Sequence, residues 1–182
     1  MITGFLPALN IVGEKQSGTI EQINVTPVKK WTFILSKLIP YWIIGYVVVS
    51  IAMGIALFYW NLKPSGSLLT IYLFASLFIV AFSGFGLVIS NYATTVQQAI
   101  LMMFFFMLTF IFLSGLYTPI ENMPQWAQLI SNISPLKYIM QVFRLVYLKG
   151  SSFSELHKQF FALLSFAIFF YTWAILSYRK TE

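Results

Sequence analysis

Long stretches of the sequence lack charged residues, and this pattern predicts helices that cross a membrane. A spanning helix needs roughly 20 consecutive apolar residues. The run from position 39 to 61 has no charge, and turn residues at 61–67 separate it from the next such run. We expect four spans, at residues 31–60, 68–90, 96–117 and 160–178.

Three further segments complete the predicted organisation. Residues 1–12 are apolar but too short to span, and residues 13–30 form a polar connector into the next span. Residues 118–159 mix prolines with aromatic and aliphatic residues, which is typical of helices that dip into a membrane or lie on it. The predicted fold class is therefore all-α, a polytopic membrane helical bundle with re-entrant or interfacial helices.

Composition supports a membrane protein and restricts the other classes. Of the 182 residues, 59% are hydrophobic and 9% are charged, whereas a soluble domain has about 25% charged residues. The formal net charge of +6 requires no nucleic-acid partner, because lysine and arginine are expected beside membrane spans. The absence of cysteine excludes disulfides and thiolate chemistry within this chain.

The predicted spans carry no acidic, basic or histidine side chain at mid-membrane depth. Ion-coupled transport normally uses such groups. The sequence also lacks the glycine-rich phosphate loop that ends in lysine and serine or threonine, so we expect no cofactor, catalytic or metal site in this chain. If transport is active, its energy must come from a partner.

Two local patterns shape the connector. Thr19 and Gln22 fit a capping box, and Thr26 followed by Pro27 fits a second helix start. One interpretation is a short helix, a break and a second helix that enters the membrane. A solvated loop between two membrane segments agrees equally well with the spacing.

Small residues recur within the segment at 68–90, where Ser83, Gly84, Gly86 and Ser90 would let another helix approach closely. Such a surface could contact another subunit or line a substrate path. Alternatively, it could form an ordinary contact between helices of one bundle. Packing inside one bundle is the preferred interpretation.

The orientation of the chain in the membrane follows from the even number of predicted spans between two basic segments. Four spans separate the connector from the basic tail after position 178, so both lie on one side, which the positive-inside rule assigns to the cytoplasm. Six of the 11 cationic residues fall on that side and five on the other, so charge alone does not fix the orientation. Lys137 and Arg144 fall on the external side, where we expect a solvated or headgroup-contacting face.

Several pieces of sequence, in order, resemble one known family. The run EKQSGTIEQINVTPVKKWTFILSKLIPYW at residues 14–42 resembles the first cytoplasmic loop and the following helix of ABC-type-2 transporter permeases. Three later pieces agree in order, namely SNYATTVQQA, LSGLYTPIENMPQWAQ and SPLKYIMQVFR. The resemblance covers nearly the whole chain. It implies that residues 1–12 are the tail of an earlier span, that the chain is the carboxy-terminal part of a permease, and that residues 118–159 form external re-entrant helices.

The resemblance also implies a function and partners. It indicates the membrane-spanning permease subunit of an ATP-driven ABC exporter in the bacterial plasma (inner) membrane. Separate ABC ATPase subunits would hold ATP, and a second permease subunit, identical or different, would complete the path through the lipid bilayer. A passive channel or a non-transport membrane scaffold is the alternative, while an intramembrane enzyme has little support. An uncharged, aromatic-rich path is compatible with lipids, drugs or other amphiphiles.

The connector is expected to contain a cytoplasmic coupling helix that contacts the ATPase. Gly18 would permit close approach of a partner backbone, while the carboxylates of Glu14 and Glu21 can pair with basic groups on that partner. Alternatively, these carboxylates pair only with Lys15 or with solvent, where an ion pair contributes about 0 to 1 kcal/mol. The predicted ATPase-coupling residues are Glu14, Gly18, Thr19, Glu21, Thr26 and Pro27.

Overall fold

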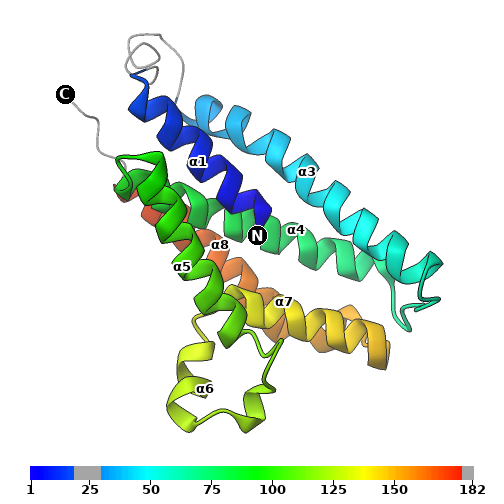
Figure 1. The fold of residues 1–182 in the computed structure, drawn as a ribbon. Helices are drawn as coiled ribbons and strands as arrows, with labels where there is room; N and C mark the ends of the chain where they lie inside the picture. Colours follow the sequence, from blue (N-terminus) through cyan, green and yellow to red (C-terminus); the bar gives the residue numbers. More distant parts are fainter. Residues whose placement is uncertain (19–29, 178–182) are drawn as a thin grey trace.

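The computed structural model of the chain describes residues 1–18 and 30–177, and within these residues it contains helices and no strand. This confirms the predicted all-α class. Figure 1 shows the helices arranged as a bundle with a smaller helical region at one end. The α-helices are α1 (Ile2–Gln16), α3 (Lys30–Phe58), α4 (Leu68–Tyr92), α5 (Val96–Leu113), α6 (Gln125–Ser131), α7 (Pro135–Arg144) and α8 (His157–Ser177).

Four of these helices are long and apolar enough to cross a membrane, as the charge-free runs predict. Their apolar stretches cover Ile34–Phe58, Leu68–Tyr92, Val96–Leu113 and Phe153–Ser177. The helix boundaries differ from the expected spans by a few residues. α5 ends at Leu113 instead of continuing to position 117, and α1 continues to Gln16, beyond the apolar segment at 1–12.

α4 is the central helix of the bundle and packs against α1 on one side and α8 on the other (Figure 1). Its aromatic side chains form the middle of the core. The ring of Phe85 meets Phe106 and Phe110 of α5 at centroid distances of 5.3 and 5.4 Å, and Phe170 of α8 at 5.2 Å. These edge-to-face contacts suit aromatic rings, whose edges are positive and faces negative.

The small residues of α4 lie at its contacts with α1 and α8. Gly86 faces the Gly4 carbonyl of α1, and Gly84 faces the ring of Tyr171 in α8. A Cβ atom at Gly84 would lie 2.8 Å from that ring. Both contacts are within this chain, which agrees with the preferred interpretation of packing inside one bundle.

A buried serine joins three helices near the middle of the bundle. The hydroxyl of Ser83 lies 3.0 Å from the indole nitrogen of Trp42 in α3 and 2.9 Å from the hydroxyl of Tyr171 in α8. It also donates to the Val80 carbonyl of its own helix at 2.8 Å. Because a hydroxyl has one donor and two lone pairs, Ser83 can accept from both aromatic side chains while donating to Val80.

The two ends of the bundle differ. α1, α4 and α8 finish at one end, where α3 and α5 begin, and α6 and α7 lie toward the other end (Figure 1). The last residues of α1 and α8, Gln16 and Ser177, therefore lie at the same end. This agrees with the parity argument from the sequence.

Residues 118–159 fold into short helices instead of an extended loop. Besides α6 and α7, they form 3-10 turns at Ile120–Asn122 and Phe153–Leu156, and a π-helical turn at Leu145–Lys149. Pro135 occupies the first turn of α7, where its missing N–H costs no helical bond. Gly150 ends the π-helical turn with φ +66°, a conformation that glycine adopts without strain.

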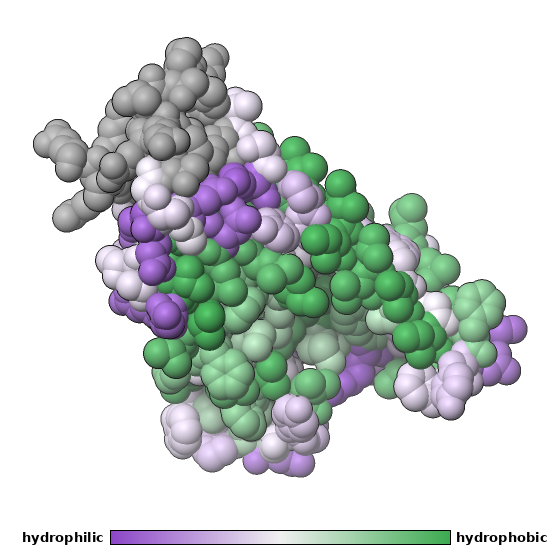
Figure 2. Space-filling model, turned by 45° about the horizontal axis from the view of Figure 1, so that its top comes forward, coloured by the Kyte–Doolittle hydropathy of each residue, from purple (hydrophilic) through white to green (hydrophobic). Residues whose placement is uncertain are grey.

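The outer helices expose apolar surface along most of their length. Figure 2 shows hydrophobic side chains across the middle of the molecule and hydrophilic ones gathered toward its ends. On α3, Ile43 and Ile51 are 59% and 56% exposed, and on α5 Leu101 is 70% exposed. An apolar surface of this extent is expected to face lipid or another membrane subunit.

Candidate coupling site

The last turn of α1 carries an ion pair to α3. The ammonium group of Lys37 donates to Oε1 of Glu14, and the two side chains are 27% and 23% exposed, respectively. Glu14 and Lys37 are 23 residues apart in sequence, and the connector lies between them. The pair therefore joins the helix that enters the connector to the helix that leaves it.

Two further side chains of α1 reach the turn between α4 and α5. Lys15 donates to the Ala93 carbonyl at 3.4 Å, and Oε1 of Gln16 accepts from the Val96 amide at 3.1 Å. The Gln16 contact satisfies a backbone N–H in the first turn of α5, which has no partner within its own helix. A small buried cluster beside it, formed around Val12, adds apolar contact between the same elements.

We refer to the contacts of Glu14, Lys15 and Gln16 as the α1 clasp. The clasp links the end of α1 to α3, to α5 and to the turn between α4 and α5, at the end of the bundle where the connector attaches. A displacement of the α1 end would therefore act on α3 through an ion pair and on the α4–α5 turn through hydrogen bonds.

Gly18 follows the clasp in a left-handed backbone conformation. Its φ of +75° is a left-handed conformation, and a Cβ atom placed there would meet nothing within 4 Å among the described residues. Glycine adopts this conformation without the steric cost that other residues incur. The expected role of Gly18 in a contact with a partner stays a prediction, because Gly18 is the last described residue before position 30.

The predicted coupling residues divide into two groups. Glu14 and Gly18 lie in the described part of the chain, whereas Thr19, Glu21, Thr26 and Pro27 lie outside the described residues. Glu14 forms an ion pair with Lys37 of α3, and its side chain is 23% exposed. Nothing in the spacing of the sequence predicts that α1 and α3 bring Lys37 beside Glu14.

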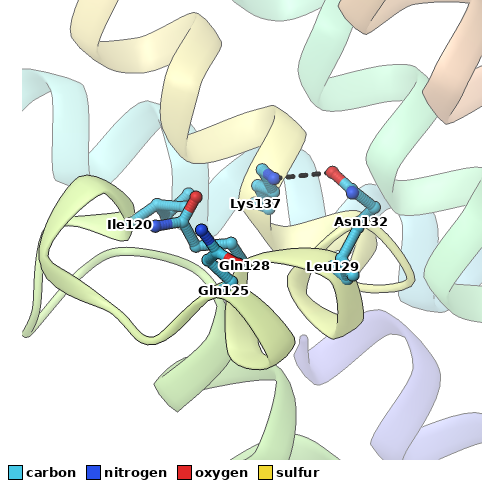
Figure 3. A pocket seen from close by; sticks show the side chains of 6 residues that line it. All are labelled: Ile120, Gln125, Gln128, Leu129, Asn132 and Lys137. Atoms are coloured by element: carbon cyan, nitrogen blue, oxygen red, sulfur yellow. Dashed lines mark hydrogen bonds between the residues drawn. The ribbon is translucent and has the colours of Figure 1, made fainter.

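The expected solvated or headgroup-contacting face is wrong for Lys137, which is buried, whereas Arg144 is exposed as expected. Lys137 is 8% exposed, and its ammonium group donates to Ser131 and Asn132. Arg144 is exposed but donates to the Gly115 carbonyl at 2.8 Å. These acceptors lie at the end of α6, just after it, and in the segment between α5 and α6. Figure 3 shows Lys137 pointing toward Asn132.

The described residues contain no group of three histidine, aspartate or glutamate side chains that could hold a metal ion. The arrangement at the α1 clasp is also poor in groups for proton transfer or nucleophilic attack. Its chemistry consists of one ion pair and hydrogen bonds to backbone groups. Such a site can hold helices together or transmit displacement between them.

Comparison with known proteins supplies the family. A family described as ABC-2 family transporter protein matches residues 1–176. The probable multidrug ABC transporter permease YbhR of Escherichia coli K12 is 31% identical over 157 residues, which are 86% of this chain and 43% of YbhR. The probable multidrug ABC transporter permease YbhS of the same organism is 30% identical over 155 residues, covering 83% of this chain and 40% of YbhS.

A third relative matches along the whole chain. The inner membrane transport permease YhhJ of Escherichia coli K12 is 26% identical over 186 residues, covering 100% of this chain and 49% of YhhJ. The chain spans less than half the length of each of these relatives. No solved structure matches it significantly. The extent of the family match, together with the four apolar helices, establishes that the chain belongs to the ABC-2 family of transporter permeases.

Proposed function

We propose that this chain is part of the membrane-spanning permease subunit of an ATP-driven exporter in the bacterial inner membrane. ATP is held by separate ABC ATPase subunits, and a second permease subunit completes the substrate path. The names of the relatives support this proposal, since two are described as probable multidrug ABC transporter permeases and one as an inner membrane transport permease.

The observation that carries the proposal is the α1 clasp. The connector is flanked by two helices whose ends are joined by the Glu14–Lys37 ion pair. Because the ion pair holds α1 and α3 together beside the connector, a force applied to the connector would move the end of α1 and the start of α3 together and would not pull them apart. The contacts of Lys15 and Gln16 extend that movement to the turn between α4 and α5.

The chemistry of the spans supports an external energy source. α4 and α5 contain no charged residue, and α8 carries its cationic residue, Lys158, in its first turn. A pump driven by protons or ions normally places ionisable groups within the membrane. Residues 1–182 also lack the glycine-rich phosphate loop. ATP hydrolysis by a partner that presses on the connector fits both features.

The coupling proposal is tested by reversing one charge in the connector. Glu21→Lys in the full-length permease is expected to abolish ATP-dependent export and to weaken co-purification of the ATPase. The reason is that the substitution replaces a carboxylate, which attracts a basic partner surface, with a cation that the same surface repels. Membrane insertion should be unchanged. ATP-dependent uptake of substrate into inverted membrane vesicles, which corresponds to export from the cell, and the amount of ATPase retained per permease are the two measurements.

Glu155→Lys is the matched control, because Glu155 is exposed on a 3-10 turn at the opposite end of the bundle. We expect it to leave export and ATPase retention close to parental values. If Glu21→Lys exports and retains the ATPase as well as the parent does, the connector is not the coupling element. Equal loss in both variants would also contradict the proposal, because the effect would then not be specific to the connector.

A further inference from the structure

A pocket of about 400 Å³ lies between α6 and α7, at the end of the bundle opposite the α1 clasp. Figure 3 shows its side chains converging from two directions, with Lys137 reaching in from α7 and the others coming from α6 and the turns that flank it. Both apolar and polar groups line it. The lining residues are Ile120, Gln125, Gln128, Leu129, Asn132 and Lys137.

Lys137 supplies a cation that is largely removed from water. Its residue is 8% exposed, and the ammonium group donates to Oγ of Ser131 at 2.9 Å and to Oδ1 of Asn132 at 2.7 Å. An ammonium group has three donors, so one remains available to a ligand. Burial lowers the pKa of Lys137, as expected for a desolvated amine. No carboxylate of the described residues forms an ion pair with it.

Two of the other polar side chains of the pocket, Gln125 and Asn132, can also donate to an anion. Oδ1 of Asn132 accepts from Lys137, so the amide nitrogen of the same side chain is a donor on the adjacent side. Gln125 is exposed and adds another amide group. The pocket lining contains no aspartate or glutamate. Gln128 donates its amide nitrogen to the Met123 carbonyl at 2.8 Å, which leaves its amide oxygen as an acceptor. An anionic ligand would therefore meet the Lys137 cation and the amide donors of Gln125 and Asn132, with the Gln128 oxygen as the one opposing group.

An apolar surface adjoins this polar pocket. Trp126, Leu129 and Ile133 on and after α6 are 66%, 71% and 65% exposed, and Leu129 also lines the pocket. Trp126 belongs to a residue type that is enriched where membrane meets water. A ligand with an anionic group in the pocket and an apolar chain over α6 would match both surfaces.

We propose that this pocket binds the phosphate group of an anionic phospholipid, with the lipid tail lying against Trp126, Leu129 and Ile133. The lipid then holds α6 against α7 at the membrane surface. Free phosphate shares the headgroup chemistry but lacks the tail, and so it would use only half of the site. The proposal concerns the end of the bundle away from the connector and does not depend on coupling to an ATPase.

Native mass spectrometry of the delipidated full-length permease tests the proposal. The protein is titrated with phosphatidylglycerol, with phosphatidylcholine and with inorganic phosphate. We expect phosphatidylglycerol to bind about tenfold more tightly than phosphatidylcholine, because the choline cation is repelled by Lys137. The size of the effect follows from a hydrogen bond to a charged group, whose loss changes an affinity by about tenfold. Inorganic phosphate should bind more weakly than either lipid.

Lys137→Gln should remove the preference for phosphatidylglycerol, and Lys149→Gln should keep it, because Lys149 is an exposed cation of the same region that does not line the pocket. Gln125→Glu provides a second test at an exposed position that does not threaten folding. It adds a carboxylate to the pocket and should lower affinity for phosphatidylglycerol about tenfold.

Three results would overturn the proposal. The first is a parent protein without preference for the anionic lipid, and the second is an unchanged preference in both Lys137→Gln and Gln125→Glu. The third is inorganic phosphate that binds as tightly as phosphatidylglycerol, since the apolar surface of α6 would then contribute nothing. Loss of the preference in Lys137→Gln and Gln125→Glu, with the preference kept in Lys149→Gln, supports it.

Discussion

Gly86 of α4 and Gly4 of α1 lie so close together that a Cβ atom at position 86 would overlap the Gly4 carbonyl. The neighbour is backbone, so it cannot rotate away as a side chain would. Gly86→Ala should therefore lower the free energy of unfolding of the full-length permease by about 1–3 kcal/mol, the usual cost of overpacking. Thermal unfolding in detergent measures this change.

Gly54→Ala is the control for that substitution. Gly54 also lies inside a long apolar helix, but a Cβ atom there meets nothing within 4 Å. Alanine in a helix interior is favoured over glycine by about 0.5–1 kcal/mol, so this variant should be as stable as the parent or more stable. Equal effects of the two substitutions would show that α1 and α4 are not in close contact in the permease.

Removing the hydroxyl of Ser83 should also destabilise the bundle. Ser83→Ala would deprive Trp42 and Tyr171 of their shared partner, 3.0 and 2.9 Å away. Hydrogen bonds between membrane helices are worth about 0.6–1.7 kcal/mol each, so we expect a loss of roughly 1–2 kcal/mol. The fluorescence of Trp42, measured with the other tryptophans replaced, should change because its indole N–H loses an acceptor.

Ser165→Ala is the matched comparison for Ser83→Ala. Ser165 is exposed and donates to the carbonyls of Phe161 and Ala162 in its own helix. Its loss should change stability by less than about 0.5 kcal/mol, as for most surface substitutions. A similar destabilisation by both variants would indicate a general effect of removing serine from a membrane helix.

The Glu14–Lys37 pair is expected to contribute a measurable coupling energy. Both side chains are about one quarter exposed, so the pair lies between the surface and buried cases. Glu14→Gln or Lys37→Gln should each lower stability by roughly 1–2 kcal/mol, and the double variant should lose less than the sum. Strict additivity in this double-mutant cycle would mean that the ion pair does not join α1 to α3.

The topology can be tested with single cysteines in a cysteine-free full-length permease. Ser17 and Ser65 are both exposed, and they follow α1 and precede α4 at opposite ends of the bundle. Ser17→Cys should react only with a thiol reagent that reaches the cytoplasm, and Ser65→Cys should react with an impermeant reagent added outside the cell. Labelling of both from the same side would overturn the proposed orientation.

Local patterns were enough to predict the fold class. Spanning helices form wherever about 20 apolar residues occur without charge, since a backbone in lipid must satisfy its hydrogen bonds internally. The helices α4 and α5 begin at the expected residues, Leu68 and Val96. The resemblance of the run at 14–42 likewise indicated the family that the comparison confirmed.

The candidate site was only partly predictable. Glu14 and Gly18 could be chosen from the run at 14–42, but the contacts of Lys15 and Gln16 could not, because they join residues 78 and 80 positions apart. Lys137 was expected on a solvated face and is instead 8% exposed. Its ammonium group instead bonds Ser131 and Asn132 at the end of α6, a contact that the hydropathy pattern does not encode.

By itself, the sequence determined how many helices are long and apolar enough to cross a membrane and that no charge lies near the middle of these segments, because both depend on the hydropathy of contiguous residues. Only the tertiary structure decided which helices touch. The Gly4–Gly86 contact, the Glu14–Lys37 pair and the burial of Lys137 each need two elements brought together in space. Lipid tails are as apolar as the helices themselves, so hydrophobicity does not select which helices pack together. The shape and polarity of particular side chains select them instead.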